Sequence, residues 1–192
     1  IGALLLAPMI ACSLARNKDF DNPVSAVVIA VSSFIIMMPM RLQITPVGSD
    51  ATVNVTQVLT FANIGSTGIF AGVLIGLLST ELFIAISRLK ALHISLGENV
   101  PPAVSKSFTA LIPTILTLSL FAVLAAILAN VLHTDLIHLI TTFIQQQLRL
   151  INTSLPGTIF IYSFGNILFT LGIHQSAVNS VVMAPLLLIS IN

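Results

Sequence analysis

The sequence predicts an all-α fold, a polytopic bundle of membrane-spanning helices, and three observations lead to this fold class. Only 7% of the 192 residues are charged, whereas a soluble domain carries roughly 25% charged residues. The mean hydropathy is +1.08, and the apolar runs are separated by short connections rich in polar residues, Pro or Gly. At about 20 apolar residues per span, the chain has room for about five or six spans.

Charge and cysteine content narrow the classes of function. The formal net charge of +1 is too small to favour nucleic acid as a partner. Cys12 is the only cysteine, so an internal disulfide is excluded and a packed thiol is expected. The chain opens with Ile1 inside an apolar run, without the basic segment of a signal peptide, and Asn192 follows another apolar run. We therefore expect an internal piece of a longer polytopic protein.

The first two helices are delimited by polar residues and proline. Residues 1–15 are expected to be the end of one span, which the polar residues 16–19 stop at an interface. Pro23 suits the first turn of the next helix, because its missing N–H would be unpaired there in any case. That helix is expected to continue to Met38.

The segment 42–60 is polar and differs from the helices around it. Residues 52–56 alternate between polar and apolar side chains, which is the period of a β-strand. A small hairpin that turns near residues 48–50 is therefore predicted. It should lie outside the lipid, because an open sheet edge in hydrocarbon would leave backbone groups unpaired.

Residues 61–87 are predicted to form a long span. Gly68, Gly72 and Gly76 recur every four residues, which places small residues along one helix face and permits a neighbouring helix to approach closely. Asn63 and Gly65 alternatively indicate a break at the start of this span. Glu81 lies near its far end, where an interfacial carboxylate within reach of water is favoured over a membrane-buried proton carrier.

The connection 88–107 is the most basic of the chain. The loop at 16–19 carries two Lys or Arg residues, the 41–60 loop carries one and this connection carries three. The positive-inside rule then places the first and the last of these loops in the cytoplasm. Residues 89–96 mix Leu and Ile with charge, which predicts an amphipathic segment at the membrane surface.

Residues 108–132 are predicted to form the next full span. Beyond it, His133, Asp135 and His138 are interpreted as a solvated boundary cluster, because a metal site would need more ligands than they offer. Residues 136–150 are amphipathic and too polar to span comfortably. They are expected either to lie in the interface or to border a polar cavity.

His174 is the residue around which a site is predicted. From Leu150 to Asn192 there is no Asp, Glu, Lys or Arg, so this imidazole is the side chain there that most readily gains a proton near neutral pH. Such residues in apolar segments usually mark a solute pathway, although hydrogen bonding to a neighbouring helix is the alternative. Gly and Pro interrupt the segment, as in re-entrant parts of transporters. They are Pro156, Gly157, Gly165, Gly172 and Pro185.

Three motifs resemble those of one family of permeases. They are the run VPPAVSKSFTALIP at 100–113, the run NIGSTGIFA at 63–71 and the tripeptide Gly172-Ile173-His174. In order and spacing they are similar to the IIC permease component of the lactose/cellobiose/diacetylchitobiose group of the bacterial phosphotransferase system. The first motif is long and specific, and together the three extend over most of the chain.

The resemblance implies a homodimer with a divided chain. Residues 1–88 would supply scaffold and dimerisation spans, and residues 89–107 would be the amphipathic connector. Residues 108–192 would be the first part of the sugar-binding transport domain. The protein would be a multi-pass protein of the bacterial cytoplasmic membrane.

The resemblance also implies an activity and partners. A IIC component binds a β-linked disaccharide such as cellobiose, diacetylchitobiose or lactose and moves it across the membrane. A phosphocysteine on the cytosolic IIB subunit, supplied through IIA and the general phosphotransferase proteins, then phosphorylates the 6-hydroxyl. His174 would lie at the sugar and accept the hydroxyl proton, since an imidazole has an ordinary pKa of roughly 6.5. The chain would carry no phosphoryl group itself, and no metal or cofactor is implied.

Other sugar contacts and two departures complete the predicted site. Gly172, Asn166 and Asn179 are candidate sugar-binding residues, with interhelical hydrogen bonding as the alternative for the two amides. Gln175 stands where the family usually has Gly. Because Gly tolerates positive φ more readily than Gln, the turn after the histidine is expected to differ from that of the family. The family's Asn-Glu-Pro motif has no counterpart, because no Glu follows Glu98, and it is expected beyond Asn192.

Two other classes of function stay open. An ion-coupled secondary transporter would need an intramembrane carboxylate, for which Glu81 is the available candidate. A truncated, non-transporting membrane scaffold is the second alternative.

Overall fold

The computed structural model describes residues 1–48, 51–56, 58–65, 67–92, 104, 108–151, 159, 163, 166–167 and 169–170, without the side chains of Lys90 and residues 144–151. The described chain is mostly helical, as predicted, with a hairpin added. Its elements are α1 (Gly2–Asn17), α2 (Pro23–Ile36), β1 (Arg41–Ile44), β2 (Val53–Thr56), α3 (Phe61–Ile64), α4 (Ile69–Ser87), the 3₁₀ turn η1 (Lys90–Leu92), α6 (Leu111–Asn130) and α7 (Leu136–Ile151).

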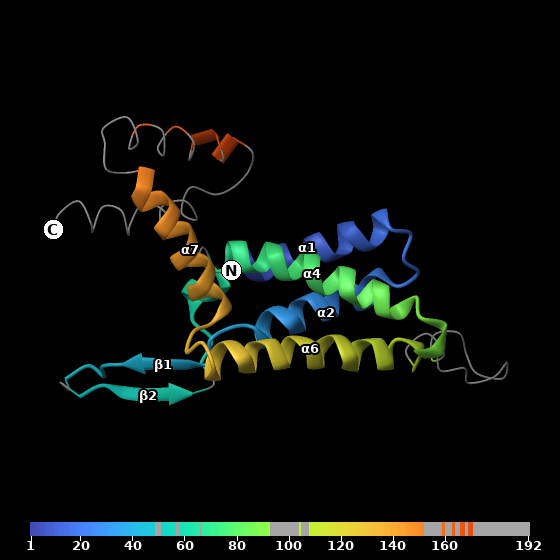
Figure 1. Ribbon diagram of the computed structural model, residues 1–192, viewed down its shortest axis with the longest axis horizontal. Coiled ribbons are helices and arrows are strands. Elements are labelled where there is room, and N and C mark those ends of the chain that lie inside the picture. Colours follow the sequence, from blue (N-terminus) through green and yellow to red (C-terminus); the bar gives the residue numbers. More distant parts are fainter. Residues whose placement is uncertain are drawn as a thin grey trace.

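The helices α1, α2, α4 and α6 lie alongside one another, and α7 crosses one end of them (Figure 1). By length and composition, α4 and α6 can cross a membrane, with mean hydropathies of 2.3 and 2.5, while α1 and α2 are apolar but shorter. Each of the predicted spans, 61–87 and 108–132, therefore contains one helix of the required length. The described part of the chain thus contains a helical core of the membrane type. The number of spans in the whole chain stays a prediction.

Small residues bring α1 and α4 into backbone contact. A Cβ added to Gly72 would lie 2.8 Å from the carbonyl oxygen of Ala3, and one added to Gly76 would lie 2.9 Å from that of Ala7. On α1, every fourth residue from Ala3 to Ala15 is an alanine with no exposed surface. The predicted glycine face is therefore a packing face, and its partner is the alanine face of α1, with the two helices parallel.

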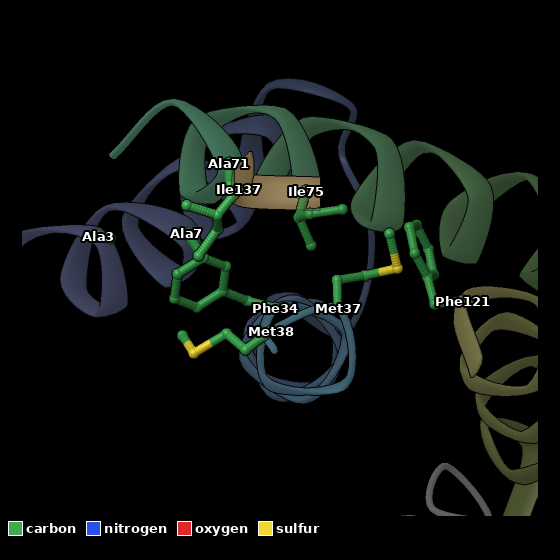
Figure 2. Close-up of a cluster of buried hydrophobic side chains, with 9 residues drawn as sticks. All are labelled: Ala3, Ala7, Phe34, Met37, Met38, Ala71, Ile75, Phe121 and Ile137. Carbon is green, nitrogen blue, oxygen red and sulfur yellow. The ribbon is translucent and has the colours of Figure 1, made fainter. Parts of the chain in front are cut away.

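Two apolar clusters hold α2 against this pair. Figure 2 shows the first, in which Met37 extends from the end of α2 toward the ring of Phe121 on α6. Its members come from five helices or helix ends: Ala3, Ala7, Phe34, Met37, Met38, Ala71, Ile75, Phe121 and Ile137. The second contains Ala15, Ala26, Ile29, Phe83 and Ile84. The start of α2 packs against the end of α4, and the end of α2 packs against the start of α4. These two helices are therefore antiparallel.

The boundaries of α2 follow from its sequence. Pro23 is in the first turn, as predicted, and the Asn22 side chain accepts a hydrogen bond from the N–H of Ser25 at 3.2 Å. This is a standard N-cap, which satisfies a backbone donor that the helix leaves free. Upstream, α1 ends at Asn17, so the polar stop at 16–19 is also confirmed.

The predicted hairpin is present. Strands β1 and β2 pair antiparallel with Arg41 opposite Thr56 and Ile44 opposite Val53, and Gly48 has a φ of +86° in the turn. Glycine adopts this left-handed conformation without steric cost. The hairpin extends away from the helices, and most of its residues are exposed (Figure 1).

The continuous helix expected over 61–87 is wrong at its start. The structure has the single turn α3, then a break, and α4 begins only at Ile69. A Cβ on Gly68 would collide with the carbonyl oxygen of Asn63, so this turn of the chain requires glycine. The break suggested by Asn63 and Gly65 is therefore the correct interpretation.

The second half begins with α6 and α7. Pro113 is buried in the first turn of α6, where its carbonyl accepts a hydrogen bond from Thr117 Oγ1 at 2.7 Å. After α6, His133 adopts a φ of +49°, and the chain turns into the amphipathic α7, which matches the predicted segment 136–150. The predicted connector at 89–107 lies largely outside the described residues, and the domain division stays a prediction.

Candidate functional site

Three of the four predicted sugar-contacting residues, His174, Gly172 and Asn179, lie outside the described residues. The fourth, Asn166, is exposed, and its backbone oxygen accepts a hydrogen bond from Thr170 Oγ1 at 3.0 Å. This contact between residues four apart is typical of helical backbone. The site proposed around His174 therefore remains a prediction from sequence.

An open pocket of about 480 Å³, the corner pocket, lies where α2 ends, β1 begins and α6 turns toward α7. Sequence analysis did not predict it, because its walls come from segments almost 100 residues apart. Its lining consists of Ile36, Met37, Met38, Pro39, Met40, Arg41, Ala125, Ala126, Leu128, Ala129, Asn130, His133, Thr134 and Asp135. Apolar side chains from α2 and α6 are thus combined with polar groups from the two turns.

Two cation-forming side chains at the corner pocket have no polar partner in the part of the chain that the structure describes. Arg41 and His133 are both exposed. Within the described ranges, neither side chain makes a hydrogen bond or ion pair. Their N–H groups are therefore available to a ligand or to water.

Asp135 supplies the acceptor on the same rim. Its Oδ1 accepts from the backbone N–H of His138 at 2.9 Å, and its Oδ2 lies 3.1 Å from His138 Nδ1. The carboxylate therefore caps the start of α7, where negative charge is favourable. Both His133 and His138 are exposed, as predicted. Among the described residues, no group of three or more His, Cys, Asp or Glu is arranged to hold a metal ion.

The opposite end of the bundle contains an ion pair that the sequence did not predict. Lys18 Nζ lies 2.5 Å from Glu81 Oε2, and Arg88 Nη2 donates to the carbonyl oxygen of Lys18 at 3.2 Å. The side chain of Glu81 is 46% exposed, and its place at the membrane interface stays a prediction. Its partner is 63 residues away in sequence, so spacing on one helix could not have identified it.

Comparison with known proteins identifies relatives along almost the whole chain. Residues 3–192 match the family described as phosphotransferase system, EIIC. The chain is 29% identical over 186 residues to the cellobiose-specific EIIC component of the PTS system of Geobacillus stearothermophilus, covering 97% of this chain and 41% of that protein. It is 32% identical over 158 residues to the oligo-beta-mannoside-specific EIIC component of Bacillus subtilis (strain 168), covering 82% and 34%.

A solved structure has the same fold. The transporter ChbC, the IIC component from the N,N'-diacetylchitobiose-specific phosphotransferase system, superposes with a TM-score of 0.70 and 26% identity. The match covers 96% of this chain and 42% of ChbC. The chain thus spans about two fifths of the length of these relatives.

Proposed function

This chain belongs to the phosphotransferase system EIIC family, and from that membership we propose that it is part of a permease for a β-linked disaccharide. The permease takes the sugar across the bacterial cytoplasmic membrane and presents its 6-hydroxyl to a IIB subunit. The family match over residues 3–192 is the observation that carries the proposal. The named specificities of the relatives, for cellobiose, oligo-beta-mannoside and N,N'-diacetylchitobiose, support this class of substrate.

His174 is the proposed catalytic residue. An imidazole can accept the proton of the sugar 6-hydroxyl as phosphoryl transfer begins, and the remainder of such a transfer depends mainly on positioning. The absence of other acidic or basic side chains between Leu150 and Asn192 supports this assignment. Gly172, Asn166 and Asn179 are proposed as sugar contacts around it, because a sugar requires several donors and acceptors in one cavity.

The division of labour along the chain is also proposed. Residues 1–88 form the scaffold and dimerisation part, residues 89–107 the connector and residues 108–192 the first part of the sugar-binding domain. The two helices α4 and α6 also differ in packing. In the most apolar stretch of α4, 44% of the residues are buried, and in that of α6 only 17%. This difference supports the division. The partners proposed are a second copy of the chain, the phosphocysteine of IIB and, through it, IIA and the general phosphotransferase proteins.

Ion-coupled transport has less support. Such a carrier needs a carboxylate that binds the coupling ion within the membrane. Glu81, the candidate, is paired with Lys18 and half exposed. No observation favours the non-transporting scaffold over the permease.

Sugar binding by the full-length parent protein tests the proposal. Cellobiose, diacetylchitobiose and lactose are titrated against the wild type, His174→Ala and the matched control His138→Ala, whose imidazole is exposed at the start of α7. We expect at least one sugar to bind the wild type and the control. In His174→Ala, phosphorylation by phospho-IIB should fall by roughly 10²–10⁴, the range for loss of a general base. The proposal is contradicted if none of the three sugars binds the wild type. It is also contradicted if phospho-IIB phosphorylates the sugar at the normal rate with His174→Ala.

A further inference from the structure

Four hydroxyl side chains form a polar layer inside the helix bundle, which we call the hydroxyl layer. Its members, Ser33, Ser79, Thr80 and Thr117, have no exposed surface. Among the described residues, every buried polar side chain belongs to this set. The layer combines α2, α4 and α6, whose other buried residues are nonpolar.

The hydroxyl layer lies between the two apolar clusters. On α2, Ser33 is four residues from Ile29 in the second cluster and four from Met37 in the first. On α4, Ser79 likewise has a member of each cluster four residues away on either side. Residues four apart share one face of a helix. The antiparallel packing of α2 and α4 therefore brings Ser33 and Ser79 to the same level of the bundle.

Two members of the hydroxyl layer donate to their own helices. Ser79 Oγ donates to the carbonyl oxygen of Ile75 at 2.6 Å, and Thr117 Oγ1 donates to that of Pro113 at 2.7 Å. A hydroxyl has one proton to donate and two lone pairs that accept. Both oxygens have thus used their proton and can still accept a hydrogen bond from a further donor.

The other two members are the unusual ones. Within the described ranges, neither Ser33 Oγ nor Thr80 Oγ1 has a hydrogen-bond partner, although both atoms are buried. A buried hydroxyl without a partner costs free energy, because it has lost its hydrogen bonds to water. Such groups are rare in native proteins, and a bound water or ion is a usual explanation. These two hydroxyls therefore point to a small bound molecule.

The chemistry of the hydroxyl layer selects water over an ion. Its members are neutral, and no Asp, Glu, Lys, Arg or His side chain that the structure describes is buried. An ion in this place would keep most of its desolvation cost. Water is neutral and can both donate and accept, and internal waters typically bridge buried polar groups that would otherwise be unsatisfied.

We propose that an internal water molecule bridges α2 and α4 in the hydroxyl layer. It accepts the proton of Ser33 Oγ and donates to a lone pair of Ser79 Oγ. Thr80 follows Ser79 and lies about 100° around α4, so its hydroxyl binds a water of its own.

The bridging water gives the contact between α2 and α4 a direction. Contacts between apolar side chains are not directional, whereas a hydrogen bond requires a fitting distance and angle. The bridge between Ser33 and Ser79 therefore fixes the register of the two helices between the apolar clusters. This role is independent of the sugar site proposed around His174.

X-ray radiolysis of the full-length parent protein tests for the water directly. Radiation forms hydroxyl radicals from water, and a radical formed inside the bundle attacks the side chains beside it. Phe34, which follows Ser33, is 1% exposed, and Phe83, one turn after Ser79, is 0% exposed. In water labelled with a heavy oxygen isotope, we expect at least one of these rings to gain the isotope. Radicals generated by peroxide in the bulk solution should leave both rings unmodified. Absence of the isotope from both rings after radiolysis would overturn the proposal.

Two neighbouring serines on α2 give the matched comparison. Ser32 is partly exposed, whereas Ser33 is buried. With water bound, Ser33→Ala removes a hydrogen-bond partner and should lower the Tm of the parent protein by about 1–3 °C and reduce the labelling of the rings. Ser32→Ala should match the wild type in both measurements.

The direction of the Tm change distinguishes a hydrated hydroxyl from a dry one. Removal of a dry, unpartnered hydroxyl would relieve its desolvation cost, so Ser33→Ala would be more stable than the wild type. An equal or higher Tm, or unchanged labelling in folded Ser33→Ala, would overturn the proposal. A lower Tm without labelled rings in the wild type would indicate a direct bond between the helices and would also overturn it. If Ser33→Ala does not fold, labelling of the wild type decides alone.

Discussion

Gly72 and Gly76 show how single residues set the distance between two helices. With hydrogen in place of a side chain, each lets the backbone of α4 lie against a carbonyl oxygen of α1. In a helix interior, Gly normally costs roughly 0.5–1 kcal/mol relative to Ala. The close approach is therefore obtained against the helix propensity of the sequence, and van der Waals contact along the two helices must outweigh that cost.

Substitution of Gly76 measures this balance. The Cβ of Gly76→Ala would lie 2.9 Å from the carbonyl oxygen and 3.1 Å from the Cα of Ala7, so the helices must separate. We expect a net destabilisation of roughly 1–3 kcal/mol, as for overpacked cores, read as a lower Tm of the parent protein in detergent. Gly2→Ala is the control, since its nearest neighbour would be an Ile69 side-chain carbon at 3.7 Å. Equal Tm values for the two variants would contradict the contact.

The pairing of Lys18 with Glu81 leads to a second prediction. Because both side chains are partly exposed, we expect Glu81→Gln to lower stability by about 0–1 kcal/mol at most and to leave sugar uptake intact. Lys18→Met serves as the matched removal of the other partner. Uptake is measured with and without a sodium or proton gradient. A transporter driven by ion binding at Glu81 would instead lose accumulation in Glu81→Gln while keeping normal expression.

At the scale of the elements, α6 differs from the other long helix. Both are apolar along their length, but α6 buries little beyond Pro113, Thr117 and Phe121, whereas α4 buries a continuous face against α1 and α2. The exposed side of α6 carries many large apolar residues. Such a surface is stable in contact with lipid or with further helices and would be unfavourable in water.

Charge placed at two positions of α6 tests that environment. Val123 lies near the middle of α6 and is 55% exposed, while Leu111 lies at its first turn and is 45% exposed. We expect Val123→Lys to cost about 2.5–3.5 kcal/mol in apparent free energy of membrane insertion. Leu111→Lys should cost much less, because a terminal Lys can extend its ammonium group to the interface. Insertion of residues 108–132 by microsomes gives both values, and equal costs would argue against a membrane-spanning α6.

At the scale of the molecule, the two ends of the bundle have different chemistry. One end combines Arg16 in the last turn of α1 with Lys18 and Arg88, which directly follow α1 and α4. The other end has the hairpin (Figure 1). The corner pocket, which Arg41 helps to line, lies beside it. The structure thus brings the 16–19 loop and the end of α4 together, as the predicted alternation of sides requires. By the positive-inside rule, the basic end is predicted to face the cytoplasm.

Labelling from outside the cell tests this orientation. In a parent protein without other cysteines, Val47→Cys places a thiol in the exposed hairpin turn, and Arg16→Cys places one at the basic end. A membrane-impermeant maleimide should label Val47→Cys in intact cells and Arg16→Cys only after permeabilisation. The opposite pattern would reverse the orientation and move the corner pocket to the cytoplasmic side.

What the sequence by itself determined is governed by local physical chemistry. Hydropathy separated lipid-compatible helices from polar loops, Pro23 and the polar residues 16–19 set helix ends, and alternation predicted the hairpin. Motifs at 63–71 and 100–113 indicated the family that the comparison confirmed. For the predicted site, the sequence singled out His174 by its chemistry without supplying its surroundings.

Only the tertiary structure decided which distant segments meet. The glycine face of α4 was visible in the sequence, but its partner, the alanine face of α1, was not. The same holds for Lys18 with Glu81 and for the corner pocket, which joins the end of α2 to the turn after α6. Residue spacing reports neighbours on one helix, whereas contacts between helices depend on how whole faces pack, and that is settled only when the bundle is assembled.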